Sequence, residues 1–447
     1  MKSPNRINHF SAPIIDLFSS ALTRFNHFSL PYPSTEMSQD GFEYDWIEDV
    51  EWLEKYRPGG YHPVVIGQMV GRYHIVEKLG FGGYSTVWLA WDTLKGGYVA
   101  LKVGIASADP REMRILRALS IPSAHPGRDA IPSPLDDFVI QGPNGHHPCF
   151  TMALAQSDLK MASENYLFPL DVARALVGGL TMAVAYMHSS GYVHGDIHLG
   201  NVLVKHPSDI NNLSIKQLYE KYGEPCPEPI TRRNGKPLPP NVPPTAISPV
   251  LLGIRANMFA LPNAHVLLGD FGESFSPSSE TRLGKDCHTP LGARPPEARF
   301  EPLFGLSYSS DIWSLAVAIW SILGMKPLFS GVFNTADDVV CQHIGALGPM
   351  PESWFRVWKQ TAKKGHRENG WDEWPSIERA FEEYVQKFRR ERAHGGFAKE
   401  EKTAILSLMR DMLQFQPGKR PTIEEVLASE WMVKWVLPEF ERLQATA

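Results

Sequence analysis

Four short motifs in one fixed order constrain this chain of 447 residues more than any other feature. A glycine-rich run, Leu79–Val87, comes first and is followed by a lysine in an apolar run, Val99–Lys102. A polar stretch, His194–Asn201, and the triplet Asp270–Gly272 come later. Each motif alone fits an ordinary turn or strand, but together they supply a phosphate cradle, a cation, a base and metal ligands. A fold that uses them must bring all four to one place.

The chain around the first two motifs is predicted to form a small sheet. Runs rich in β-branched and aromatic side chains are separated by glycine turns, which is typical of strands in hairpins. The expected strands are Tyr73–Leu79, Ser85–Trp91 and Tyr98–Val103, and a short helix is expected over Pro110–Leu119. The glycine-rich run therefore joins two strands, and the lysine lies in the third.

The later part of the chain is predicted to be mostly helical. Apolar residues at helical spacing or in continuous runs mark four segments, which are Asp171–His188, Asp311–Leu323, Ile377–Arg392 and Lys399–Gln414. Residues 205–262 differ, because nine prolines lie between Pro225 and Pro249 among few large apolar side chains. We therefore expect an irregular and mobile insertion there.

Bulk properties limit the partners and the location. A net charge of −5 gives no reason to expect nucleic-acid binding, and four scattered cysteines favour a reduced, intracellular protein. The apolar stretch Ile312–Leu323 is too short to span a bilayer. We expect residues 1–45 to be a disordered tail and 46–72 an extended lead-in. A mitochondrial transit peptide also fits the tail, but we favour a cytoplasmic or nuclear monomer that contacts no membrane.

The first two motifs suit the binding of phosphate groups. Backbone N–H groups can approach a phosphate closely where Gly80 and Gly82 carry no Cβ. Lys102 would neutralise the same phosphates if a carboxylate held its ammonium group in place. Glu112, on the helix that follows, is the candidate partner.

The last two motifs suit phosphoryl transfer. Asp196 would orient a hydroxyl group and accept its proton, while Asn201 would ligate a metal ion and Asp270 would hold the Mg²⁺ that bridges the phosphates. Phosphoryl transfer needs little covalent help from a protein, so positioned charges and metal ions would supply most of the rate.

These motifs resemble those of eukaryotic protein kinases, and most closely those of the serine/arginine-rich-protein kinases (SR-protein kinases). Three features carry the closer resemblance: the lead-in from Gly59 to His74, Ser85 in place of the usual third glycine, and the long insertion at 205–262. Wider kinase features follow, since Arg294–Glu297 is similar to the end of an activation segment and Gln416–Thr422 to a late arginine motif.

The resemblance implies an α+β, bilobal protein-kinase fold, with a small antiparallel sheet lobe that carries one key helix (73–155) and a large, mainly helical lobe (156–440). It implies a serine/threonine protein kinase that uses ATP and Mg²⁺ on a protein substrate of the Arg/Ser-rich splicing type. It also implies that Arg420 pairs with Glu297 and that Met152 is the gatekeeper before the hinge. The residues that it assigns to ATP are Leu79, Gly80, Phe81, Gly82, Gly83, Tyr84, Ser85, Val87, Ala100, Lys102, Met152, Ala153 and Ala155.

Two positions depart from the family's pattern. Gly195 stands where most protein kinases have an arginine that grips a phosphate on the activation loop, so we predict activity without phosphorylation of that loop. His198 stands where a lysine normally contacts the transferred phosphoryl group, and histidine is only partly charged near neutral pH. His198 is still counted with Asp196, Lys102 and Glu112 among the catalytic residues.

Two other functions compete with this interpretation. A pseudokinase, which binds nucleotide without turnover, would explain His198 and the unusual hinge residues, but it has no chemical need for the complete catalytic set. A small-molecule kinase is the second alternative, because His194–Asn201 also resembles the catalytic loop of aminoglycoside and choline kinases. The protein-kinase motifs near Glu297, Asp311 and Arg420 argue against it.

Overall fold

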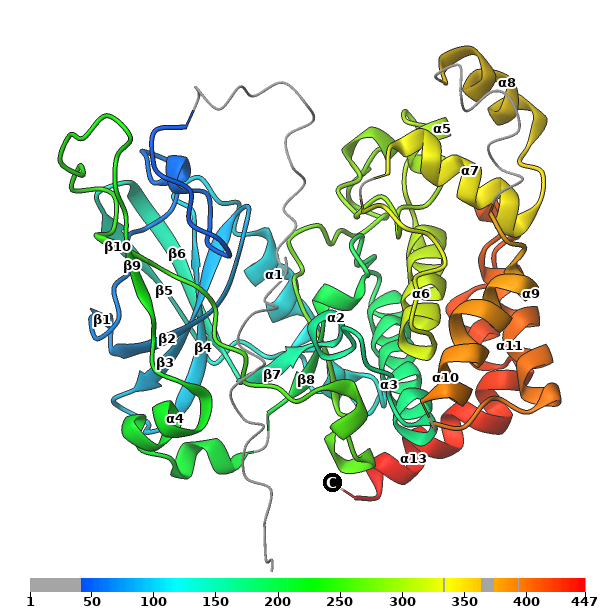
Figure 1. Ribbon diagram of the computed structural model, residues 1–447, viewed down its shortest axis with the longest axis horizontal. Coiled ribbons are helices and arrows are strands. Elements are labelled where there is room, and N and C mark those ends of the chain that lie inside the picture. Colours follow the sequence, from blue (N-terminus) through cyan, green and yellow to red (C-terminus); the bar gives the residue numbers. More distant parts are fainter. Residues whose placement is uncertain (1–41, 207, 333, 363–373, 393, 447) are drawn as a thin grey trace, which may run out of the picture. The chain divides into compact units, whose positions relative to one another are not determined.

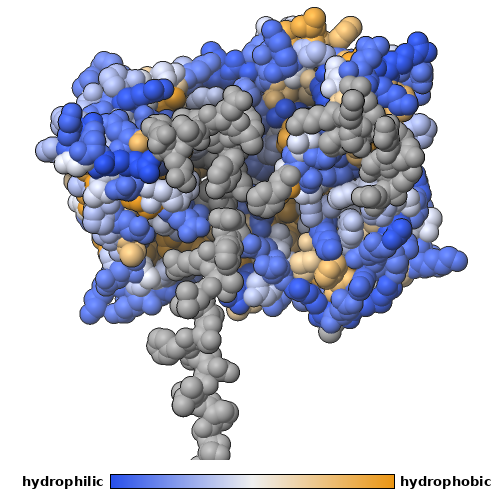
Figure 2. Space-filling model, turned by 45° about the horizontal axis from the view of Figure 1, so that its top comes forward, coloured by the Kyte–Doolittle hydropathy of each residue, from blue (hydrophilic) through white to orange (hydrophobic). Residues whose placement is uncertain are grey.

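The computed structural model describes residues 42–446 apart from 207, 333, 363–373 and 393. All elements named below belong to one compact unit, Phe42–Ala447. Most of the predicted disordered tail, and with it the question of a transit peptide, lies outside the described residues. On the face shown in Figure 2, the coloured surface is mostly hydrophilic, with small separate hydrophobic areas.

The small lobe is built on a six-stranded antiparallel sheet in the order β1-β2-β3-β4-β6-β5 (Figure 1). Its strands are β1 (Met69–Val70), β2 (Tyr73–Gly82), β3 (Ser85–Asp92), β4 (Tyr98–Gly104), β5 (Asp136–Gly142) and β6 (Gly145–Met152). The three predicted strands are confirmed as β2, β3 and β4, and the predicted helix is α1 (Arg111–Leu119). The expected antiparallel sheet lobe with one key helix is therefore present.

A second, three-stranded sheet connects the hinge to the polar motifs. It consists of β7 (Ala155–Asp158), β8 (Val202–Lys205) and β11 (Val266–Leu268), in the order β11-β8-β7. Val202 in β8 pairs with Leu268 in β11. Because the His194–Asn201 run ends where β8 begins, and the Asp270 triplet follows β11, this antiparallel pairing brings the two motifs together.

The rest of the described chain is mainly helical, as predicted. Its helices are α2 (Leu159–Ala162), α3 (Leu170–Ser189), α5 (Glu297–Phe300), α6 (Tyr308–Leu323), α7 (Ala336–Leu347), α8 (Glu352–Thr361), α9 (Ile377–Ala380), α10 (Lys387–Glu391), α11 (Lys399–Met412), α12 (Ile423–Leu427) and α13 (Leu437–Gln444). The predicted helix at 377–392 is interrupted, because a π-helical turn, Phe381–Gln386, separates α9 from α10.

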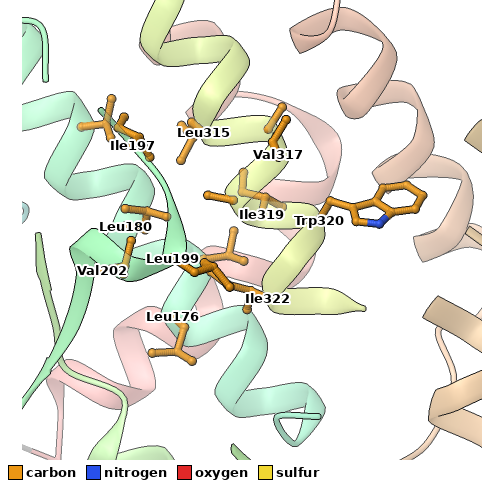
Figure 3. Packing of buried hydrophobic residues seen from close by; sticks show 14 of the residues in the cluster. Leu176, Leu180, Ile197, Leu199, Val202, Leu315, Val317, Ile319, Trp320 and Ile322 are labelled. Atoms are coloured by element: carbon orange, nitrogen blue, oxygen red, sulfur yellow. The ribbon is translucent and has the colours of Figure 1, made fainter. Parts of the chain in front are cut away.

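Two apolar helices, α3 and α6, form the centre of this helical lobe. Figure 3 shows Leu176 and Leu180 of α3 near Leu315, Ile319 and Ile322 of α6, all in one buried cluster. By length and composition alone α3 could cross a membrane, but 78% of its most apolar window is buried inside the protein, so it is a core helix. Full burial of each such side chain stabilises the fold by roughly 1.5–3 kcal/mol.

The predicted insertion is irregular in part and contains some regular structure. Residues 205–262 contain α4 (Ile215–Tyr222) and a hairpin of β9 (Pro227–Pro229) and β10 (Thr245–Ile247), and most of the chain around this hairpin is irregular as expected. Although the segment is rich in proline, several of its apolar side chains are buried, including Leu218 and Ile230. Prolines are tolerated because this hairpin is a separate two-stranded sheet.

An aromatic cage in the helical lobe encloses His343 of α7. The ring of His343 lies 4.4 Å from that of Phe329 and 5.1 Å from that of Trp313. Neither ring nitrogen has a hydrogen-bond partner among the described residues. Burial, assisted by the charges of Arg299 and Arg420, lowers the pKa of His343 to about 3. The imidazole is therefore neutral in the folded protein.

We expect His343→Leu to flatten the acid side of the stability profile. Between an ordinary histidine pKa of about 6.5 and the folded value of about 3, the unfolded chain binds a proton at this site that the folded chain does not. Stability therefore falls as the pH falls, by up to about 1.4 kcal/mol per pH unit from this group. Urea unfolding at several pH values from 7 to 4 would measure the slopes. Equal slopes for the two proteins would contradict a neutral His343.

Candidate active site

The glycine-rich run is the tip of the β2–β3 hairpin. Phe81 pairs with Thr86 and Gly82 with Ser85, so the chain reverses over Gly83 and Tyr84. A Cβ built on Gly80 or Gly82 would meet nothing described within 4 Å. The protein's own packing does not require glycine at these two positions, but the close approach of a phosphate would.

Lys102 is held between carboxylates from both lobes. Its Nζ lies 2.7 Å and 2.6 Å from the two carboxylate oxygens of Glu112 on α1, and 3.4 Å from Asp270 Oδ1. The predicted Lys102–Glu112 contact is confirmed. Burial opposes the ammonium charge, but Asp270 and Glu112 outweigh it and raise the pKa of Lys102. The lysine is therefore a fixed cation.

Helix α1 is anchored in the helical lobe, which fixes Glu112. Ile115, Leu116 and Leu119 are buried in the same cluster as the side chains of α3 and α6. The hydroxyl of Tyr186, on α3, also donates a hydrogen bond to the carbonyl of Leu119 (2.8 Å). The Lys102–Glu112 pair thus depends on core packing as well as on charge.

Asp311, near the start of α6, anchors the backbone of the polar loop His194–Asn201 through hydrogen bonds. Its carboxylate accepts hydrogen bonds from the N–H groups of His194 (2.7 Å) and Gly195 (2.9 Å), and His188 Nε2 lies 3.0 Å from it. Sequence reasoning used Asp311 only to mark the central helix. Its anchoring role depends on contacts more than 100 residues apart in the chain, which no local pattern reveals.

Side chains alternate between core and cleft along the same loop. Ile197 and Leu199 are buried against α3 and α6 (Figure 3), so Asp196 and His198 face the other way. Asn201 Nδ2 donates to the backbone carbonyl of Asp196 (2.9 Å) and to its Oδ2 (3.1 Å). Asp196 Oδ1 is buried without a hydrogen-bond partner among the described residues. That oxygen can therefore accept a further hydrogen bond.

His198 is oriented by its own loop. Its Nδ1 accepts a hydrogen bond from the N–H of Gly200 (3.1 Å), which leaves Nε2 to carry the proton. Nε2 lies 3.5 Å from Asp196 Oδ2. The imidazole therefore presents a donor edge beside the carboxylate of Asp196.

The donor set fits Mg²⁺ shared with phosphates. Because Asn201 uses its amide nitrogen on Asp196, the amide oxygen is the atom that could ligate a metal. The charge of Lys102 lowers the pKa of Asp270, so that carboxylate is ionised. No cluster of three or more His, Cys, Asp or Glu side chains suited to a metal occurs in the described part of the chain. Mg²⁺ commonly takes only one or two carboxylates and completes its shell with phosphates and water.

Asp270 also has a left-handed backbone, with φ of +57°. Such a conformation is costly for an aspartate and tends to occur at functional sites. The next residue, Phe271, is fully buried, with its ring 5.3 Å from that of His194. The packed phenylalanine holds the aspartate in this conformation.

The predicted adenine end is apolar and includes a residue that the sequence did not reveal. Leu79, Val87 and Ala100 belong to one cluster with Leu154 of the predicted hinge and Leu252 of the insertion. Met152 pairs with Ala100 across β6 and β4, and Ala155 pairs with Lys205 across β7 and β8. Met152 therefore lies beside Ala100 in the small-lobe sheet, whereas Ala155 lies in the second sheet next to β8. Ala153 lies between them in the chain, and the role of all three in binding ATP stays a prediction.

A backbone hydrogen bond joins the insertion to the strand that leads into this apolar wall. The N–H of Val250 donates to the carbonyl of Lys78 (2.8 Å), beside the start of the glycine-rich run. Leu252 is only 3% exposed. No local pattern in the sequence predicts that Leu252 is buried, because it follows a proline-rich stretch and its packing partners lie far away in the chain.

Gly195 has a structural reason to be glycine. Its φ is +78°, and a Cβ there would lie 2.8 Å from the backbone oxygen of Glu273. The hydroxyl of Thr289 donates to the Gly195 carbonyl (2.8 Å). An arginine would therefore strain this backbone, whatever its charge could contribute.

The segment from Asp270 to Glu297 is held by internal ion pairs. Glu273 contacts Arg282 (2.9 Å) and His288 Nδ1 (2.8 Å). Farther along, both carboxylate oxygens of Glu280 lie 2.8 Å from Arg111 Nη1 at the start of α1. Glu273 and Glu280 are thus paired with cations, the first within the segment and the second on α1.

The predicted Arg420–Glu297 pair is present. Arg420 contacts the two carboxylate oxygens of Glu297 at 2.8 Å and 2.6 Å, with both side chains buried. It also donates to backbone carbonyls, including that of Ser309 (2.8 Å). A buried bidentate pair with these further bonds fixes the end of the segment against α6.

Known proteins match this chain in family, sequence and fold. The protein kinase domain family model matches residues 255–432. A serine/threonine protein kinase of Aspergillus fumigatus is 27% identical over 86% of this chain and 90% of its own length. The serine/threonine-protein kinase SRPK of Physarum polycephalum is 26% identical over 86% and 91%. Human SRSF protein kinase 3 is 38% identical, over 35% of this chain and 30% of that protein.

A solved kinase domain has the same fold. It covers 83% of this chain and 98% of its own length with a TM-score of 0.53, at 17% identity. The expected bilobal kinase architecture is confirmed by this likeness together with the antiparallel sheet and the helical lobe. At this level of identity the likeness concerns the fold alone.

We expect Gly195→Ala to destabilise the protein by about 1–3 kcal/mol and to lower activity, because it adds steric conflict to a left-handed backbone. Gly191→Ala is a matched control, since its φ is +84° but its Cβ would meet nothing described within 4 Å. Urea unfolding of both variants would separate the two costs. Equal losses of unfolding free energy in the two variants would mean that the contact with Glu273 does not add to the destabilisation.

Proposed function

We propose that the chain is a serine/threonine protein kinase, similar to the SRSF protein kinases, and that it transfers the γ-phosphoryl group of ATP to serine or threonine of a protein substrate. The observation that carries this proposal is the combination of a fixed lysine and an available carboxylate oxygen. Lys102 is held by Glu112 and Asp270, and Asp196 Oδ1 has no hydrogen-bond partner among the described residues.

Each side chain then has one task. The glycine-rich tip covers the phosphates with N–H groups, and Lys102 contributes a fixed positive charge to them. Asp196 Oδ1 would accept the hydrogen bond of the substrate hydroxyl. It would take the proton as the bond from that oxygen to the γ-phosphorus forms and the bond from the γ-phosphorus to the leaving ADP breaks. Asn201 and Asp270 would hold Mg²⁺, which would neutralise charge on the phosphates.

The substrate class rests on the resemblance and the relatives. Several of the similar proteins, including those of human and pig, are SRSF protein kinases. We infer an Arg/Ser-rich protein substrate and a monomeric enzyme. The internal pairs of Glu273 and Glu280 support activity without phosphorylation of residues 270–297.

The reaction can be tested by radiolabelled ATP turnover with Mg²⁺ on three acceptors: an Arg/Ser-repeat peptide, a basic protein without such repeats, and choline. We expect label on the Arg/Ser peptide and a loss of about 10²–10⁴-fold with Asp196→Asn. Asp411→Asn, on the exposed side of α11, is the matched control and should keep the rate. Phosphatase treatment beforehand should also leave the rate unchanged.

Three results would contradict the proposal in different ways. Label on choline alone would identify a small-molecule kinase. Bound ATP without label on any acceptor would identify a pseudokinase. Loss of activity after phosphatase treatment would show that the carboxylate pairs do not replace a phosphate.

We expect His198→Lys to keep or raise kcat. Lysine would place a full positive charge near the transferred group, where the neutral form of histidine offers only a hydrogen bond. The substitution also removes the hydrogen bond that His198 Nδ1 accepts from Gly200. Steady-state kinetics would decide, since a large fall in kcat would mean that the imidazole has a role that a cation cannot take over.

A further inference from the structure

The chain before β1 forms a compact element that the proposed chemistry does not use. We call residues 53–62 the lead-in turn. The N–H of Tyr61 donates to the carbonyl of Lys55 (3.0 Å), and that of Gly60 donates to Arg57 (2.8 Å). A Cβ on Gly60 would lie only 1.8 Å from the Lys55 carbonyl oxygen, so the turn closes this tightly because residue 60 is glycine.

The lead-in turn grips the tip of the glycine-rich hairpin at two consecutive peptide groups. The hydroxyl of Tyr61 donates to the carbonyl of Gly82 (2.7 Å), and Lys55 Nζ donates to the carbonyl of Gly83 (3.1 Å). A peptide group is planar, so fixing these two carbonyls also fixes the N–H groups of Gly83 and Tyr84. Glycines have the widest backbone freedom, and such a tip needs external anchors to hold one conformation.

The side chains that hold the tip are themselves buried in a packed cluster. Tyr61 is 1% exposed and Tyr56 is 3% exposed, with ring centroids 5.5 Å apart. Beneath them, Glu51 accepts a hydrogen bond from the Tyr56 hydroxyl and forms a buried ion pair with Lys78 of β2. The lead-in turn is therefore fixed to the same strand that leads into the glycine-rich tip.

The insertion holds the lead-in turn from the other side. Asn241 Nδ2 donates to the carbonyl of Tyr56 (2.7 Å). Ile230, Val242 and Ala246 of the insertion share one buried cluster with Tyr56 and Tyr61. The insertion thus packs against the lead-in turn, and the lead-in turn contacts the tip of the hairpin.

The turn also reaches the segment that leads to α1. Its carbonyls at Gly59 and Gly60 accept hydrogen bonds from the N–H groups of Ser107 and Ala106, both 3.0 Å long. Ser107 and Ala106 lie between β4, which carries Lys102, and α1, which carries Glu112. The lead-in turn is therefore hydrogen-bonded both to the tip of the hairpin and to the chain between Lys102 and Glu112.

We propose that Tyr61 and Lys55 are positioning residues for the phosphates of ATP, which they arrange by holding the Gly82 and Gly83 peptide groups. The inference rests on the proposed function in that ATP is the ligand of this hairpin. Neither side chain contacts the reacting atoms. Their effect is to keep the N–H groups of the tip aligned before the nucleotide arrives, so that binding does not have to order the loop.

The test is Tyr61→Phe, with Tyr56→Phe as the matched control. Each variant removes one hydroxyl from a buried tyrosine of the same cluster, but only Tyr61 contacts the tip. We expect Tyr61→Phe to weaken ATP binding by about threefold to tenfold and to leave adenosine binding unchanged, because adenosine has no phosphates. Tyr56→Phe leaves the Glu51–Lys78 ion pair and both hydrogen bonds to the tip in place, so its effect on ATP affinity should be well below that of Tyr61→Phe. Calorimetric titrations of the full chain with ATP and with adenosine would measure both affinities.

Amide hydrogen exchange gives a second readout. We expect faster exchange at residues 82–85 in Tyr61→Phe and not in Tyr56→Phe. Lys55→Met, at a partly exposed position, gives the same test if Tyr61→Phe does not fold.

Three results separate this proposal from the proposed function. Equal effects of Tyr61→Phe and Tyr56→Phe, or equal losses of ATP and adenosine affinity, would overturn the positioning role. Unchanged exchange at the tip would overturn it as well. If the wild-type chain bound no ATP, the proposed function would fail and the role in binding phosphates with it, while the exchange rates would still show whether Tyr61 holds the hairpin.

Discussion

The buried carboxylate of Asp311 is the interaction on which the rest of the site depends. It is 1% exposed, and a charge so far from water is tolerable only when several donors satisfy it. The donors are two backbone N–H groups of the loop before Asp196 and the ring of His188. Unless the loop adopted this conformation, Asp311 would be left uncompensated, so the loop and the start of α6 stabilise each other. The position of Asp196 follows from that coupling.

Charge in the cleft is balanced across the lobes. The carboxylate of Glu112 comes from the small lobe and that of Asp270 from the helical lobe, and Lys102 contacts both. The left-handed backbone of Asp270 adds strain that the buried ring of Phe271 offsets. A site of this kind exchanges partners when phosphates and a metal ion enter, because Lys102 can turn from Asp270 to the nucleotide while Glu112 keeps it in place.

Local pattern and chemistry were enough to predict the strands, the main helices and the Lys102–Glu112 pair, because a lysine in an apolar strand demands a carboxylate partner. The Arg420–Glu297 pair, which joins residues 123 positions apart, was implied only by the family resemblance. The regular structure in the insertion was not predictable, because Leu218 and Leu252 have partners far away in the chain, and composition alone suggests disorder. Gly195 was interpreted as the loss of a phosphate-binding arginine, whereas its positive φ and its contact with Glu273 can be seen only in three dimensions.

Two segments of the proposed active site are each held in place by side chains of the same chain. At one side of the cleft, the glycine-rich tip is held by Tyr61 and Lys55 from the chain that precedes the sheet. At the other side, Glu273 pairs with Arg282 and His288. Both anchors are made by unmodified side chains of this chain. Control of such an enzyme would then act on access of substrate or on the anchors themselves, rather than on the chemistry of residues 270–297.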